Sequence, residues 1–184
     1  KLNLKKDKYF LVSFHREENI DSKNLKEFLL TLDRIADKYK LPIIFSTHPR
    51  TKKKITQLKL NINPLIQLLK PLNFSDYNSL QLNSLVTLSD SGTISEESAI
   101  LKFRAINIRD NHERPEAMEE TSVILTGTNS DRIIQSIELI KNQQVNHILM
   151  DVDDYAADNI SIKIERLLIS YTDYINKKVW RKES

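Results

Sequence analysis

Chemically capable side chains gather in five polar segments of the sequence, each of which directly follows a short apolar run. Histidine can take or give a proton near neutral pH, and the guanidinium of arginine offers a planar fork to oxyanions. Loops often carry functional groups, so these segments are the first candidates for a site. Three of the four histidines and four arginines lie in them: His15, His48, His112, Arg16, Arg50, Arg109 and Arg114.

The strongest candidate for binding an anion is the tripeptide Ser91-Gly92-Thr93. It lies between a predicted strand and a predicted helix, which Thr93 and Glu96 would open as a capping box. The first N–H groups of a helix are unpaired and carry the positive end of its dipole, so a phosphate there gains hydrogen bonds and a favourable field. Gly92 would let the backbone approach that ligand, although an ordinary strand-to-helix turn also accounts for a glycine.

Two adjacent carboxylates, Glu96 and Glu97, point in different directions if this segment is helical. We expect Glu96 to be the capping-box acid, which leaves Glu97 either to accept hydrogen bonds from ligand hydroxyls or to remain a solvated carboxylate. His15 could stabilise a leaving phosphate or move a proton, but it could also simply cap its loop.

The remaining histidines and acids admit further interpretations. His15, His48 and His112 with Asp90 form a conceivable metal site, yet no HxH or HxxxH spacing supports it. Arg114 and the preceding Glu113 could form part of a phosphate clamp or an ordinary surface pair.

The elements that must position these groups follow from the pattern of apolar residues. Strands that are apolar throughout, alternating with amphipathic helices, predict an α/β fold with a Rossmann-like parallel sheet flanked by helices on both faces. In such folds ligands bind beyond the carboxyl ends of the strands, where the five polar segments lie. The predicted strands are Tyr9–Phe14, Pro42–Thr47, Leu65–Leu69, Leu85–Leu88, Ala105–Ile108 and Ser122–Leu125. The predicted helices start near Ser22, Lys53, Asp76, Thr93, Pro115 and Ser130, and a last long helix covers about 159–180.

The composition of the chain excludes several classes of protein and of binding site. The 184 residues are 40% hydrophobic, enough for a real core, and the absence of cysteine excludes disulfides and thiolate chemistry and fits a cytoplasmic protein. Only two residues are glycine, so a glycine-rich dinucleotide loop or Walker loop is impossible. A net charge of +3 is too small to imply nucleic acid, and no apolar run approaches the ~20 residues of a membrane span.

Three motifs together resemble the non-hydrolysing UDP-N-acetylglucosamine 2-epimerase family. They are His15-Arg16-Glu17-Glu18-Asn19, the run from Ser89 to Glu97, and His112-Glu113-Arg114-Pro115-Glu116. The resemblance covers nearly the whole chain and is nearest to the capsule and O-antigen branch, which includes enzymes forming UDP-N-acetyl-L-fucosamine. Thr93 replaces a second glycine of the common epimerases, and residues 102–104 replace a Gly-Lys-Pro turn.

The resemblance implies one half of a glycosyltransferase-B type fold, with residues 1–184 as the C-terminal UDP-binding domain and the N-terminal domain absent from this chain. It implies that UDP is bound by Leu72 and Tyr77 at the uracil, Glu97 at the ribose, and Ser91, Gly92, Thr93 and Arg114 at the phosphates. His15 would serve the departing or returning UDP as the catalytic residue. Possible supporting residues are Arg16, Asn19, His48, Arg50, Asp90, Glu96, His112 and Glu113.

The implied reaction eliminates UDP across C1–C2 of a UDP-2-acetamido sugar and adds it back with C2 inverted, without cofactor or metal. The carboxylates that move the C2 proton would belong to the missing domain, so this chain alone would be inactive, and the full enzyme would be a homodimer. Two alternatives stay open: a transferase domain of the glycosyltransferase-B type that binds a UDP-sugar, and an inactive split-gene remnant.

Overall fold

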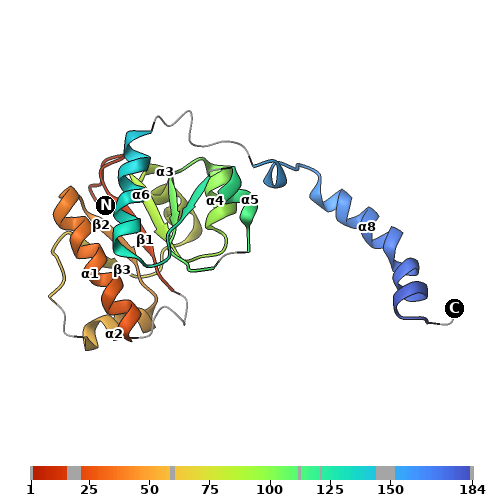
Figure 1. Cartoon of the computed structure of the whole chain (residues 1–184), viewed down its shortest axis with the longest axis horizontal. Coiled ribbons are helices and arrows are strands. Elements are labelled where there is room, and N and C mark those ends of the chain that lie inside the picture. Colours follow the sequence, from red (N-terminus) through yellow and green to blue (C-terminus); the bar gives the residue numbers. More distant parts are fainter. Residues whose placement is uncertain are drawn as a thin grey trace. The chain divides into compact units, whose positions relative to one another are not determined.

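The computed structural model describes residues 2–15, 22–58, 61–111, 113–120, 122–143 and 152–182 (Figure 1). The chain divides into two compact units, Lys1–Val152 and Asp153–Ser184. The first unit carries the sheet and all the candidate site residues. No helix among the described residues is long and apolar enough to cross a membrane.

The first unit is built on one parallel sheet in the order β3-β2-β1-β4-β5-β6. The chain therefore builds outward from β1 in one direction, then returns to place β4 on the other side of β1. This reversal is the topological switch point, where open α/β sheets bind ligands. The strands are β1 (Phe10–Ser13), β2 (Ile43–Ser46), β3 (Ile66–Leu69), β4 (Val86–Ser89), β5 (Ala105–Asn107) and β6 (Val123–Leu125). The predicted Rossmann-like α/β fold is confirmed.

The strands are apolar on both sides, and helices cover both faces of the sheet. The main core cluster joins β1, β2, β4 and β5 to α1, α2 and α6, with Phe14 stacked on Phe28 at 4.2 Å between ring centroids. Two smaller clusters place α3 and α4 on the opposite face. The helices are α1 (Ser22–Tyr39), α2 (Pro49–Gln57), α3 (Phe74–Asn83), α4 (Ile94–Leu101), α5 (Pro115–Glu119) and α6 (Ser130–Asn142).

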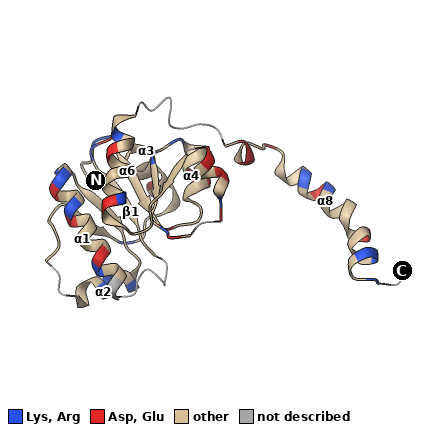
Figure 2. Cartoon of the chain, viewed as in Figure 1, with Lys and Arg blue, Asp and Glu red and all other residues tan. Residues whose placement is uncertain are grey.

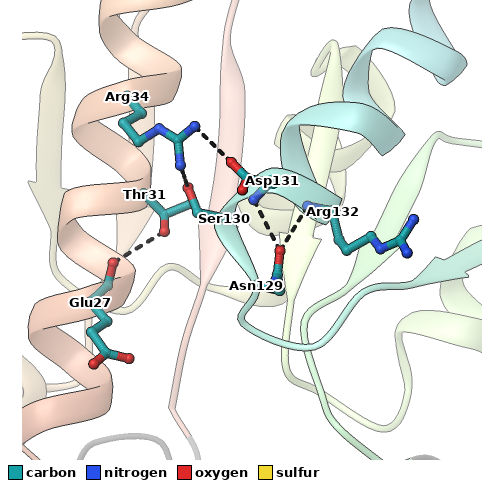
Figure 3. A network of polar contacts seen from close by, with 7 residues as sticks. All are labelled: Glu27, Thr31, Arg34, Asn129, Ser130, Asp131 and Arg132. Atoms are coloured by element: carbon teal, nitrogen blue, oxygen red, sulfur yellow. Dashed lines mark hydrogen bonds and ion pairs between the residues drawn. The ribbon is translucent and has the colours of Figure 1, made fainter.

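A polar network fixes the start of α6 against α1 (Figure 3). Asn129 caps α6 by accepting hydrogen bonds from the N–H groups of Asp131 and Arg132, at 3.1 and 3.0 Å. Arg34 of α1 donates to Ser130 at 2.5 Å and to Asp131 at 2.8 Å. These contacts hold two helices of the same face side by side, away from the switch point.

Helix α2 begins four residues earlier than predicted. The segment read as a polar loop, from His48 to Lys52, instead contains the cap and the first turn. Pro49 occupies the first helical position, where its missing N–H is no loss, and the His48 Nδ1 accepts the Arg50 N–H at 3.3 Å.

The second unit is helical. It contains a short 3-10 turn, Asp153–Tyr155, then α8 (Ile160–Tyr174), which passes into a π-helical turn, Ile175–Val179. These bounds agree with the long helix predicted near 159–180.

Candidate functional site

The loops after β1 and β4 are tied together at the switch point. The backbone N–H of His15 donates to both carboxylate oxygens of Asp90, at 3.1 and 2.9 Å, and the Asp90 N–H donates to the Ser13 carbonyl at 3.2 Å. Asp90 is only 1% exposed. A buried carboxylate that accepts two hydrogen bonds holds its partner firmly, so Asp90 fixes where His15 enters the loop after β1.

The imidazole of His15 is tuned by its surroundings. Loss of hydration lowers the pKa of His15 below the ordinary 6.5; Asp90 acts in the opposite direction, whereas nearby His48 lowers it further. The residue as a whole remains accessible. His15 is therefore neutral near pH 7, with one ring nitrogen able to donate and the other able to accept.

The turn from Ser91 to Thr93 is organised by its own hydroxyl groups. Ser91 Oγ accepts the Thr93 N–H at 3.3 Å and lies 2.9 Å from the Thr93 hydroxyl, while Ser89 Oγ accepts the Ser91 N–H at 3.1 Å. Thr93 precedes α4 with φ −75° and ψ −4°, and its side chain makes no capping bond. Because a cap residue normally has extended backbone, the predicted Thr93–Glu96 capping box is wrong.

The two carboxylates of α4 have different partners from those predicted. Glu96 accepts from Nε of Arg114, at the start of α5. Glu97 instead receives the Thr93 hydroxyl at 2.6 Å and the Gln81 amide at 2.5 Å. Acidic residues therefore crowd the first turn of α4 (Figure 2), and each is held by a neighbouring element. Each Glu97 oxygen accepts one bond and keeps a lone pair for a further donor.

Gly92 leaves space for two guanidinium groups. A Cβ at this position would lie 3.3 Å from Nη1 of Arg114 and 3.6 Å from Nη1 of Arg109. Gly92 is thus not required by an unusual backbone angle, and its approach to a ligand stays a prediction. Sequence analysis assigned no role to Arg109, which is buried here. The sequence feature that could have indicated a role for Arg109 is its position in the same polar segment as Arg114.

Four neighbouring strands each end at a small polar residue. Ser46, Ser13, Ser89 and Asn107 are the last residues of β2, β1, β4 and β5, and they pair in register. Register partners in a parallel sheet share a face, so this row forms a polar strip at the carboxyl end. This polar strip was not among the predicted features, although the sequence shows a polar residue at the end of several apolar strands.

The tyrosine predicted to meet the uracil is anchored in this strip. Burial raises the pKa of Tyr77 to about 12, while the nearby side chains of Ser13 and Ser89 act in the opposite direction. Its ring packs beside the cluster of Tyr9, Leu11 and Ile44. Half-buried Leu72 lines a nearby groove of about 760 Å³ with residues of β3 and α3. The two predicted base contacts thus lie in the same part of the fold.

The other supporting residues are placed less centrally or not described. His48 caps α2, while Arg50 and Glu113 are exposed. Arg16, Asn19 and His112 lie outside the described residues. Over the described ranges, no group of three or more histidine, aspartate or glutamate side chains is arranged to hold a metal ion.

Comparison with known proteins matches this chain along most of its length. A sequence model described as UDP-N-acetylglucosamine 2-epimerase matches residues 1–169. The epimerase of Methanocaldococcus jannaschii is 39% identical over 145 residues, which are 76% of this chain and 40% of that protein. This chain thus spans less than half the length of the curated relatives it matches.

Solved structures agree with the sequence matches. The UDP-N-acetylglucosamine 2-epimerase of Rickettsia bellii superposes with a TM-score of 0.83 at 41% identity, covering 98% of this chain and 49% of that one. The Methanocaldococcus jannaschii enzyme in complex with UDP-GlcNAc and UDP gives 0.73 at 34% identity, covering 90% and 46%. The sheet unit is therefore one Rossmann-like half of a glycosyltransferase-B type fold, and the chain belongs to the UDP-N-acetylglucosamine 2-epimerase family.

Proposed function

We propose that this chain is the UDP-binding half of an epimerase that inverts C2 of a UDP-2-acetamido sugar. The observation that carries the proposal is the turn at Gly92, where two guanidinium groups stand beside the amino end of α4. Oriented N–H groups and arginines are what a diphosphate requires. The solved relative in complex with UDP-GlcNAc and UDP supports this ligand.

In the proposed reaction C2 loses its proton and C1 loses UDP, which leaves a C1–C2 double bond; UDP then adds back to C1 while C2 takes a proton on the opposite face. A diphosphate leaving group needs oriented donors and cations rather than a nucleophile. The Ser91–Thr93 turn and Arg114 would bind the departing charge from the β4 side, and His15 would face it from the β1 side. An approaching diphosphate would raise the pKa of the neutral His15, so the imidazole could supply a proton to the leaving oxygen.

The rest of the nucleotide would follow the carboxyl end of the sheet away from Gly92. The free lone pairs of Glu97 would accept the ribose hydroxyls, since its present partners hold the carboxylate in one orientation. Tyr77 and Leu72 would contact the uracil beside α3.

The chain would need a second half to complete the reaction. We propose that the carboxylates that move the C2 proton lie in an N-terminal domain, in a homodimeric enzyme of capsule or O-antigen precursor synthesis. The support is that relatives of the same family are about twice as long as the region they share with this chain.

Isothermal titration of the 184-residue chain with UDP tests the proposal. Wild type should bind UDP, and Glu97→Gln should weaken binding by about 10-fold, because a charged acceptor for the ribose is lost. Glu138→Gln is a matched control, since Glu138 also accepts a tyrosine hydroxyl and a lysine but lies on α6. A folded wild-type chain without affinity for UDP would overturn the proposal.

A second measurement separates an epimerase from a transferase of the same fold. An enzyme that includes the other half should incorporate deuterium at C2 of the UDP-sugar in deuterated water, as followed by NMR. Transfer of the sugar to an acceptor without exchange at C2 would favour the transferase instead.

A further inference from the structure

We infer that Arg109 is a second phosphate-binding residue, and that it supplies the positive charge that the diphosphate neutralises. This inference rests on the proposed function, because it assigns a new residue to the same UDP site. Arg109 follows β5, two positions after the last residue of the polar strip.

The burial of Arg109 is the first argument. The residue is only 7% exposed, and no carboxylate of the described part of the chain forms an ion pair with it. Burying a charge without a partner is unfavourable unless something else compensates it. A bound anion is the simplest compensation.

The direction of the side chain is the second argument. Ile108 points into the main core, while Nη1 of Arg109 lies 3.6 Å from the position a Cβ would take at Gly92. Nη1 of Arg114 lies 3.3 Å from the same point. Two guanidinium groups thus converge on the turn that opens α4.

The local charge is the third argument. Three carboxylates surround this turn: Asp90 before it, and Glu96 and Glu97 in the first turn of α4. Arg114 is already paired with Glu96. Without Arg109 the acidic groups would oppose a diphosphate, so Arg109 decides whether the turn attracts an anion.

An unpaired oxygen lies on the same strand. The Oδ1 atom of Asn107 is buried with no hydrogen-bond partner in the described residues, although nearly all buried polar atoms have one. It ends the polar strip two residues before Arg109. Within the described residues the site therefore holds a buried acceptor without a partner and a cation without an ion pair, and a ligand carrying both hydroxyl and phosphate groups would bind both.

The experiment compares UDP with uridine on Arg109→Met, which keeps much of the side-chain length and removes the charge. UDP affinity should fall by about 10- to 100-fold, as expected for a lost charge-assisted contact, while uridine affinity should change by less than about twofold. Arg109→Lys should recover part of the loss, because it restores a point charge without the planar fork.

Arg104→Met is the matched control, because Arg104 precedes the same strand at its other end and carries the same charge. It should leave both affinities unchanged. Unchanged UDP binding in Arg109→Met would overturn the inference, and so would an equal loss of UDP and uridine, which would make Arg109 a structural residue. Failure of wild type to bind UDP would instead overturn the proposed function.

Discussion

The two ends of the parallel sheet differ in how many of their buried polar groups have a hydrogen-bond partner within the protein. At the amino end, Ser84 Oγ donates to the Gln81 carbonyl, Ser122 Oγ donates to the Ala117 carbonyl, and Ser98 Oγ donates to the Ser122 carbonyl, all between 2.8 and 3.0 Å. At the carboxyl end, Asn107 Oδ1 is buried without a hydrogen-bond partner among the described residues, and Arg109 makes no ion pair with them.

This contrast indicates the carboxyl end of the sheet as the place where a ligand would bind. Native folds satisfy buried polar groups internally when nothing else will do so. The amino end mostly follows this rule; exceptions among the described residues are Oε1 of Gln81 and Nε of Arg104, whose Nη1 lies 3.5 Å from Asp7. Groups left over at the carboxyl end are thus readily explained by a bound molecule.

The largest expected effect is loss of stability at the carboxyl end. Asp90→Ala should lower the free energy of unfolding by about 2–3 kcal/mol, because a buried acceptor of the His15 N–H is removed. Ser84→Ala at the amino end should cost about 1–1.5 kcal/mol, as it removes only the neutral contacts of the Ser84 hydroxyl with the Gln81 carbonyl and the Thr87 hydroxyl. Urea denaturation measures both, and equal losses would contradict the asymmetry.

Substitutions at the two glycines should distinguish an effect on stability from an effect on UDP binding. Gly127→Ala should destabilise the fold by about 1–2 kcal/mol, because Gly127 has φ +61° and a Cβ would meet the Asp110 carboxylate. Gly92→Ala should cost little stability but weaken UDP binding, since a Cβ there would crowd only the flexible ends of arginine side chains. Thermal unfolding and UDP titration of both variants test this. The reverse order of stability would refute it.

Relieving strain at the amino end should stabilise the protein without affecting ligand binding. Lys102 ends α4 in the left-handed conformation, with φ 57° and ψ 53°. Lys102→Gly should therefore raise the free energy of unfolding by about 0.5–1 kcal/mol. Lys53→Gly, within α2, is the control and should destabilise instead. A change in UDP affinity in Lys102→Gly would mean that the two ends are coupled.

The smallest effect is the pH dependence from His15. Its pKa is lowered in the fold, so below about 6.5 the unfolded chain binds more protons and stability falls. Above that pH the imidazole is neutral in both states and contributes no slope. His15→Asn should flatten the loss of stability between pH 7.5 and pH 5.5 that wild type shows in urea melts. An unchanged slope would place the titrating group elsewhere.

Local patterns in the sequence were sufficient for most of the elements, whereas the roles of the candidate site residues stay predictions. Apolar runs such as Phe10–Ser13 form strands because both faces of the sheet are covered, and Pro115 opens a helix because its fixed φ suits the first position. The motifs around His15, Gly92 and Arg114 were sufficient to indicate the family. Such features depend on neighbours within a few residues, so they are readable along the chain.

Only the tertiary structure decided which partner each charged group takes. Glu96 lies three residues after Thr93 but binds Arg114, 18 positions further on, and Glu97 binds Gln81 from another helix. Arg109 looks like any loop arginine until the fold buries it beside Gly92. Burial and the absence of a partner depend on what long-range packing brings together, so residue order alone determines neither.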